Sequence, residues 1–455
     1  MTGSLTYQST PAAPGKGHSR RTMVLSLMVS LLFPPFLLYA AWRTPSFRQR
    51  HWLLTIFVTY YGITLPIAYD PSGVGPDGVR HLLVVYTYYL DMSFGVFLGD
   101  LRSILMLEGA PGSNDPYKHL VSYFVGGILG VPELFFPIVA FVYGYFFTGS
   151  MLIVFREFRL GKLPWVVVFL ALAFFLTRNI EAVQAVRNPT AIWVLIYGIL
   201  KYHETQKIRY LLLMASTPLI HFGFLLIAIP AFLFLLIGNR PLLFSVLFVL
   251  SSSMNLLAPT DVTGVIGGFE LGERKLGAYY TEERAELEDR NVRFQQGIAE
   301  GSRLWWAYMQ AGYNRISFNL FVYGLIFSGA YMLAMSRFQM SIFSTGLLTL
   351  AAANSLWFLG GVTGRLWEVG FLLTMAGFLL WRSGSTYDFR ELKVPIVYRL
   401  GMYTAAIGLI PYVLFQMSKG LEQLNIFLFG LPLLAVIFPD ANLTVKEALR
   451  ALLFI

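Results

Sequence analysis

Apolar residues follow one another in long, continuous runs along most of this chain, with short polar segments between them. The runs are about 20 residues long, which is the length a helix needs to cross a hydrocarbon core of roughly 30 Å. They do not alternate between apolar and polar residues, so helices are predicted rather than strands. The pattern therefore predicts an all-α, polytopic integral membrane protein with about 13 transmembrane helices.

The boundaries of these helices follow from the apolar runs and the turn signals between them. We expect spans at about 22–42, 51–69, 132–154, 164–178, 189–201, 241–257, 316–335, 340–359, 367–381, 396–416 and 423–438, and a helical hairpin at 209–237. Asp91 and Asp100 interrupt the run 82–108, which we interpret as an interfacial helix. If that run spans, the orientation of every later helix is reversed. Residues 118–130 predict a second short helix.

The chain is expected to form one membrane domain over residues 22–455, preceded by a polar tail at 1–21. One long polar connection, 258–315, interrupts it. Within this loop, residues 281–303 predict a charged surface helix with Thr281 as its N-cap.

Composition agrees with this class of protein: the chain is 56% hydrophobic and 13% charged, with a mean hydropathy of +0.62. The net charge of +9 lies mostly in short loops, where basic residues orient helices, so it does not indicate nucleic-acid binding. Basic short loops such as 43–50 and 155–163 are predicted to be cytoplasmic. The Asp77 loop, Arg187, the tip of the hairpin, the long loop and Arg365 are then extracytoplasmic.

Several kinds of chemistry are excluded by the motifs that the sequence lacks. The chain has no phosphate-binding G-x-x-x-x-G-K-[ST] loop, no H-E-x-x-H motif, no closely spaced metal-ligand cluster and no cysteine. The predicted outer face instead carries arginines, one histidine and a few carboxylates. Arginine pairs with phosphate oxygens through two parallel hydrogen bonds, and histidine moves protons near neutral pH. This combination suits a diphosphate anion and a proton transfer, with no metal and no cofactor expected.

The order of these residues resembles that of the Wzy/EpsG-like polysaccharide polymerases of bacteria. The strongest likeness is R-N-P-T-A at 187–191, followed by a basic turn and then a hydrophobic helix that carries His221 in a run ending at Pro230. G-P-D-G-V-R at 75–80, D-P-Y-K-H-L at 115–120 and G-G-V-T-G-R-L-W at 360–367 follow the family's order. Where the family has Gln after the opening arginine, this chain has Asn188, which we expect to cap a helix begun by Pro189.

The resemblance implies a glycosyltransferase that joins oligosaccharide repeat units carried on polyprenyl diphosphate, at the outer face of the bacterial cytoplasmic (inner) membrane. Implied partners are this lipid-linked oligosaccharide, the bilayer, and a chain-length regulator and flippase of the same pathway. Arg187 and Arg365 are expected on the diphosphate, with Arg178 in support. His221 or Asp77 is the expected base. The reserve candidates are Arg80, Asp115, Glu133 and Glu181.

Other interpretations stay open at this stage. Arg187 and Arg178 are alternatively arginines that extend from helix ends to the interface, and Arg365 alternatively pairs with Glu368. Asp77 is alternatively a turn former before Gly78, and His221 an interhelical hydrogen-bonding residue. A different lipid-linked glycan transferase or ligase, or a transporter of polysaccharide or lipid-linked oligosaccharide, is the alternative function.

Overall fold

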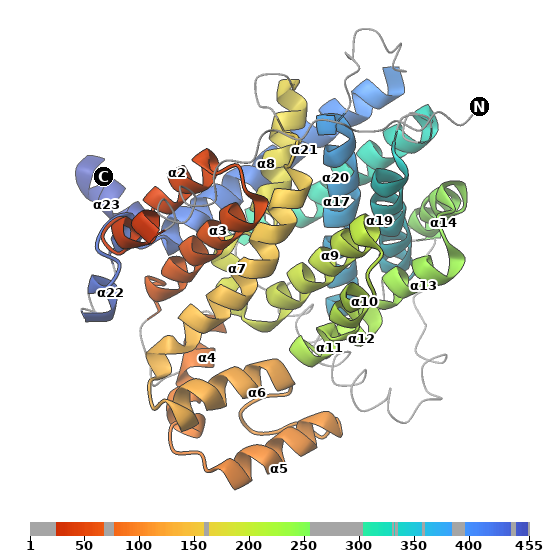
Figure 1. Cartoon of the computed structure of the whole chain (residues 1–455). Helices are drawn as coiled ribbons and strands as arrows, with labels where there is room; N and C mark the ends of the chain where they lie inside the picture. The colour runs from red at the N-terminus through yellow and green to blue at the C-terminus, as the bar shows by residue number, and fades with distance from the viewer. Residues whose placement is uncertain are drawn as a thin grey trace.

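The computed structural model describes residues 24–67, 77–158, 163–254, 304–329, 332, 335–356, 360–384, 396–437 and 443–453. Within these ranges every regular element is a helix, and residues 425 and 444 form an isolated bridge (Figure 1). Three helices in these ranges are long and apolar enough to cross a membrane: Pro132–Val154, Trp165–Ala185 and Ile396–Gln423. The all-helical fold is as predicted and is compatible with a polytopic membrane protein, whereas the count of about 13 crossings is not confirmed.

The longer helices pack in pairs, some of which are neighbours in the sequence and others distant from each other. The principal pairs are α3 (Phe47–Ile63) with α7 (Phe135–Val154), α7 with α9 (Arg187–Thr205), α14 (Pro241–Met254) with α19 (Arg337–Ser355), α19 with α20 (Gly360–Gly384), and α17 (Leu304–Ser328) with α21 (Ile396–Gln423). α8 (Trp165–Leu176) packs against α20 and α21. α2 (Phe36–Arg43) follows the break at Pro34 and Pro35 and packs on α3.

Small residues allow α19 and α20 to approach closely. A Cβ atom placed on Gly346 would lie 2.4 Å from Thr374 Oγ1, and one on Gly377 would lie 2.8 Å from the backbone nitrogen of Phe343. Helices in a bilayer associate through such close van der Waals packing, because burial from water does not drive them together. This pair holds α20, which carries Arg365 and Glu368, in a fixed position.

The predicted single helix at 82–108 is wrong, because the chain breaks near Asp91. α4 (Asp77–Val84) continues as a π-helical turn, η1 (Val85–Tyr89), and a new helix, α5 (Phe94–Leu105), begins after Ser93. The Ser93 hydroxyl accepts a hydrogen bond from the Val96 amide and so caps α5. Neither segment has the length of a span. α4, α5 and α6 (Pro116–Tyr123) lie together at one end of the molecule (Figure 1).

The predicted hairpin at 209–237 is a series of short helices. They are α10 (Ile208–Ala215), α11 (Thr217–Ile220), α12 (Phe224–Ile227) and α13 (Ile229–Ile237). His221 occupies the break between α11 and α12 in an extended conformation. α11 contacts both α6 and α9, and α12 contacts α20. The break therefore brings His221 to the place where the first and last thirds of the chain meet.

Other boundaries also differ from those expected. The predicted span 423–438 is absent: α21 runs on to Gln423, and residues 424–437 form the short helices η7 (Ile426–Phe429) and α22 (Leu434–Ile437). One further helix, α23 (Val445–Leu453), follows in the described residues. Gly430 is extended, Leu431 has a φ of 57° and Pro432 follows, so a continuous helix cannot form there. α17 begins at Leu304, within the predicted loop. The predicted surface helix at 281–303 and the tail at 1–21 lie outside the described residues.

Candidate functional site

Asp115 lies at the centre of a charged cluster that joins four distant parts of the chain. Its side chain is 2% exposed and precedes α6. It accepts a hydrogen bond of 2.6 Å from Arg187 Nη1 and one of 2.7 Å from the backbone amide of Phe222. Burial raises the pKa of the Asp115 carboxyl. The opposing effects of His221, Arg187 and the Phe222 amide are together larger, and they lower this pKa to about 2. The carboxylate is therefore ionised at neutral pH.

His221 meets the same carboxylate with one ring nitrogen and leaves the other without a partner. Its Nδ1 lies 3.4 Å from both oxygens of Asp115. Its Nε2 is buried and has no hydrogen-bond partner among the described residues. A carboxylate at Nδ1 favours the tautomer with the proton on that nitrogen, so the lone pair is on Nε2. This is the arrangement that a general base requires.

Arg365, on α20, brings a second unpaired nitrogen into the neighbourhood of His221 Nε2. Its Nη1 is buried and likewise lacks a hydrogen-bond partner within the described ranges. A Cβ atom placed on Gly223 would lie 3.0 Å from Arg365 Nη1 and 3.5 Å from His221 Nε2. Both unpaired nitrogens thus converge beside Gly223, where a side chain would fill the space between them. Asp115, Arg187, His221 and Arg365 are called the Asp115 cluster below.

Arg187 is placed by the start of α9. The helix begins at Arg187 itself, after Val186, and no side chain caps it. The predicted cap by Asn188 is therefore wrong: Asn188 is the second helical residue, and its Oδ1 has no partner in the described part of the chain. The guanidinium lies at the positive end of the helix dipole, so Arg187 and the helix end together favour an anion.

The segment before α9 is irregular and is held by two buried side chains. Arg178 has a φ of 51° and Val186 a φ of 50°, between which lies the short 3-10 helix η5 (Ile180–Ala185). Each such residue costs on the order of 1–3 kcal/mol. Trp193 Nε1 donates to the Arg178 carbonyl at 2.9 Å, and the Tyr143 hydroxyl donates to the same carbonyl. These bonds fix the segment that carries Arg178, Glu181 and Arg187.

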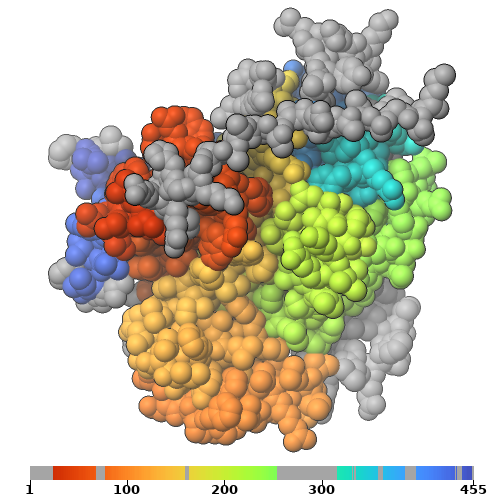
Figure 2. All heavy atoms as spheres, in the orientation of Figure 1, coloured from red at the N-terminus to blue at the C-terminus, as the bar shows by residue number. Residues whose placement is uncertain are grey.

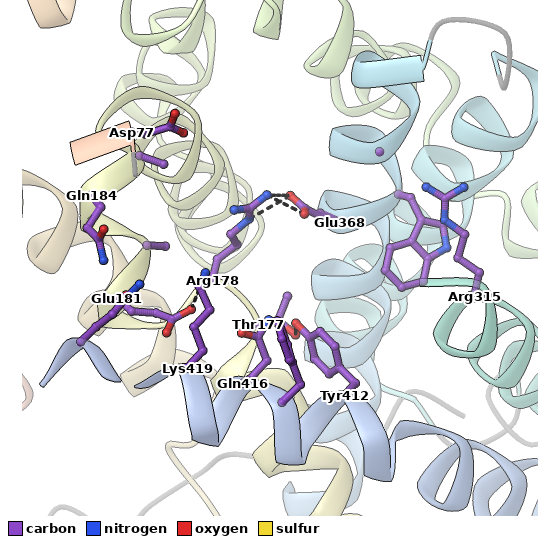
Figure 3. A pocket seen from close by; sticks show the side chains of 16 residues that line it. Asp77, Thr177, Arg178, Glu181, Gln184, Arg315, Glu368, Tyr412, Gln416 and Lys419 are labelled. Carbon is purple, nitrogen blue, oxygen red and sulfur yellow. Dashed lines mark hydrogen bonds and ion pairs between the residues drawn. The ribbon is translucent and has the colours of Figure 1, made fainter. Parts of the chain in front are cut away.

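Arg178 forms a bidentate ion pair with Glu368. Its Nη2 lies 2.7 Å from one carboxylate oxygen of Glu368, and its Nε lies 3.1 Å from the other. Glu368 thus pairs with Arg178, and not with Arg365 as in the alternative interpretation of the sequence. Figure 3 shows the two side chains reaching toward each other at the edge of a cavity. Arg178 is already partnered, which sets it apart from Arg365.

This cavity, called the polar cavity below, has a volume of about 520 Å³. It lies between η5, α20 and α21, and its lining includes Arg178, Glu181, Arg315, Trp367, Glu368, Tyr412, Gln416 and Lys419. Gly364, which precedes Arg365, and Ala185, two residues before Arg187, also line it. The polar cavity and the Asp115 cluster therefore share α20, and they adjoin each other where η5 leads into α9.

The remaining predicted residues lie outside the Asp115 cluster. Asp77 is the first residue of α4, where the sequence predicted a loop; it pairs with Arg80 at 2.5 Å and also lines the polar cavity. Both side chains are more than half exposed. Glu133 accepts a hydrogen bond from the Tyr86 hydroxyl. Glu181 pairs with Lys419 at 3.1 Å.

Two basic residues near the cluster were not predicted. Lys118, on α6, is buried and donates to the Gly112 carbonyl at 3.1 Å. Burial, and then the neighbouring Arg187, lower the pKa of its amine to about 8. His81, on α4, is also buried, and burial followed by the charge of Lys118 holds its pKa well below the usual value. Lys118 follows Asp115 by three residues in D-P-Y-K-H, a spacing that would place it near the carboxylate at a helix start.

Comparison of the chain with protein-family models, curated proteins and solved structures finds no match. No group of three or more histidine, aspartate or glutamate side chains with the arrangement of a metal site occurs among the described residues. The site offers an oriented histidine, an unpaired arginine and a second arginine at a helix start.

Proposed function

We propose that this chain is a glycosyltransferase that polymerises oligosaccharide repeat units carried on polyprenyl diphosphate. In this reaction a hydroxyl of the acceptor unit attacks the anomeric carbon of the donor chain. The bond from that carbon to the diphosphate oxygen breaks, and its electron pair leaves with the lipid diphosphate. The acceptor hydroxyl loses a proton, so the site needs a base near the hydroxyl and positive charge near the leaving group.

The observation that carries the proposal is the unpaired Nε2 of His221, with Asp115 behind the ring and Arg365 beside it. Asp115 orients the ring and stabilises the imidazolium that forms when Nε2 takes the proton. Arg365 Nη1, without a partner in the described part of the chain, is available to a diphosphate oxygen. A base and a cation that converge on one point suit displacement of an anionic leaving group by a hydroxyl.

Arg187 has two roles in this proposal. Its Nη1 holds Asp115 at 2.6 Å, which keeps the carboxylate in place behind His221. Its side chain is 31% exposed, so the other guanidinium nitrogens can contact a diphosphate that approaches the start of α9. Arg178 contributes less to the leaving group, since Glu368 already neutralises it.

Orientation and partners also belong to the proposal. The distribution of basic residues between short loops favours placing the site at the outer face of the bacterial cytoplasmic membrane. A flippase would deliver the lipid-linked units there, and a chain-length regulator would act on the product. The proposed reaction uses no metal and no other cofactor.

The test is the length distribution of surface polysaccharide in a host that lacks this gene. The gene is restored as wild type, His221→Ala or Arg365→Ala, with Arg156→Ala, an exposed arginine paired with Glu204, as the matched control. Equal membrane levels of each protein are verified. The proposal expects single repeat units without a polymer ladder from the two site variants, and a full ladder from the control.

Two other outcomes would contradict the proposal in different ways. A full ladder from both site variants would place the chemistry elsewhere. Loss of even the single unit from the cell surface, in the deletion host and in both variants, would indicate a transporter.

A further inference from the structure

The polar cavity has a different electrostatic character from the Asp115 cluster. Three acidic and three basic side chains line it, so the formal charges balance. Four of them are joined in pairs, Arg178 with Glu368 and Glu181 with Lys419. A diphosphate would have to compete with these carboxylates for their cations, so the cavity is poorly suited to a strongly anionic ligand.

The wall of the polar cavity instead combines aromatic rings with single hydrogen-bonding atoms. Trp367, Tyr412 and Phe415 contribute rings. Trp367 Nε1 and Gln416 Oε1 are buried and have no hydrogen-bond partner in the described ranges, although the Gln416 side chain also contacts Tyr412. Buried polar atoms are normally paired, so unpaired ones on two residues that line the same cavity favour a ligand there. A ligand with apolar faces and many hydroxyl groups meets both features.

The position of the cavity connects it to the proposed chemistry. Gly364 lines the cavity, and the next residue, Arg365, belongs to the Asp115 cluster. Glu368 lies one helical turn further along α20 and lines the cavity together with its partner Arg178. The cavity and the Asp115 cluster are therefore neighbours along α20.

We infer that the polar cavity binds the sugar residues of the acceptor oligosaccharide, with Trp367 and Gln416 contacting the sugars. This inference rests on the proposed function, because only a glycan transferase needs a second, uncharged saccharide beside its leaving-group site. It assigns donor diphosphate and acceptor sugars to separate sets of residues. The Asp115 cluster holds the diphosphate, and the polar cavity holds the acceptor.

The experiment measures the binding of two probes to the full chain in lipid nanodiscs by isothermal titration calorimetry. One probe is the lipid-free repeat oligosaccharide released from the host polysaccharide, and the other is inorganic pyrophosphate. Trp367→Phe and Gln416→Leu are expected to weaken oligosaccharide binding about tenfold, the effect of one lost hydrogen bond, and to leave pyrophosphate binding unchanged. Arg365→Ala is expected to do the reverse.

Trp381→Phe is the matched control. Trp381 lies on the same helix, its Nε1 also lacks a hydrogen-bond partner among the described residues, and Arg382 lies 5.5 Å from its ring. Trp367 has the corresponding contact with Arg315 at 5.7 Å. Trp381 does not line the cavity, so Trp381→Phe should bind the oligosaccharide as the wild type does.

Two results would overturn the inference. The first is a wild-type protein that does not bind the oligosaccharide, and the second is equal binding by Trp367→Phe, Gln416→Leu and wild type. A different result would contradict the proposed function, namely a full polymer ladder from His221→Ala and Arg365→Ala. Both results are also possible together: oligosaccharide binding that depends on Trp367, and a full ladder from His221→Ala and Arg365→Ala. In that case the polar cavity would still be a saccharide-binding site, but it would not be the acceptor site of the proposed reaction.

Discussion

The carboxylate of Asp115 lies 3.4 Å from Nδ1 of His221, although 106 residues of chain separate them. The backbone amide of Phe222, the next residue, donates to the same carboxylate at 2.7 Å. Asp115 thereby holds both the ring of His221 and the broken helix that carries it. One side chain couples the α4–α6 end of the molecule to the proposed base.

Replacing Asp115 by asparagine tests this coupling. Asparagine preserves the shape of the side chain but removes the charge that pairs with Arg187 and that stabilises a protonated His221. We expect polymerisation to slow by about 10²–10⁴-fold, the usual contribution of an oriented acid or base. The measurement is the rate of polymer formation from lipid-linked repeat units by the purified protein.

Asp100→Asn is the control for this substitution. Asp100 accepts a hydrogen bond of 2.7 Å from the Tyr88 hydroxyl, within the α4–α5 region and away from His221. Its replacement should leave the rate within a small factor of wild type. Equal rates for Asp115→Asn and wild type would show that the ion pair with Arg187 is structural only.

Acid should remove the stabilisation that Asp115 provides. Its pKa is about 2 in the folded protein and 3.8 in a free side chain, so the folded state binds this proton less readily than the unfolded state. The contribution is therefore complete above about pH 4 and is lost as the pH falls toward 2. A shift of this size corresponds to roughly 2–3 kcal/mol. The measurement is the thermal midpoint in nanodiscs between pH 5 and pH 2.5.

The matched comparison for the pH series is Asp115→Asn, which lacks the titrating group. Its thermal midpoint should fall less over the same interval, because only the other carboxylates titrate. Parallel curves for the two proteins would contradict the lowered pKa of Asp115.

Gly223→Ala should impair activity without destabilising the fold. Gly223 has helical backbone angles, with φ of −54° and ψ of −17°, so alanine fits the conformation. Its methyl group would lie 3.0 Å from Arg365 Nη1 and 3.5 Å from His221 Nε2, where the proposal places the reacting groups. We expect at least about a tenfold loss of polymerisation rate, because small displacements from the reactive geometry are costly.

Gly420→Ala controls for the added methyl group, since a Cβ atom at Gly420 meets no atom within 4 Å. The thermal midpoints of both variants should match that of the wild type. Full activity in Gly223→Ala would show that the reacting groups do not meet at this point.

The ion pair between Arg178 and Glu368 should behave as a partly buried one. The two side chains are 31% and 24% exposed. Arg178→Met leaves Glu368 without its partner and should cost roughly 1–3 kcal/mol, less than the loss in a fully buried pair. Arg178→Met/Glu368→Met should recover part of this loss. Arg156→Met, in an exposed pair, should cost under about 1 kcal/mol.

The double-mutant cycle is measured as the free energy of unfolding in a denaturing detergent. A coupling energy near zero between Arg178 and Glu368 would contradict the assigned pair. Arg178 would then be free of a partner and would again be a candidate for binding the diphosphate.

The sequence by itself determined the helical class of the protein, because continuous apolar runs and the need to pair every backbone group in lipid leave helices as the solution. It also located the span at 132–154, where turn residues and run length agree. His221 and Arg187 could be selected because charged and ionisable groups beside apolar runs are costly.

Only the tertiary structure decided which of these groups meet. Asp115 was a reserve candidate in the sequence, and the partner that the sequence offered for Glu368, as an alternative, was Arg365 rather than Arg178. Contacts across 72 residues for Arg187 and Asp115, and across 190 for Arg178 and Glu368, depend on how helices pack, and no local pattern encodes such packing. The predicted span at 423–438 was wrong for a local reason. Its apolar composition suggested a helix, but the backbone at Gly430, Leu431 and Pro432 does not continue one.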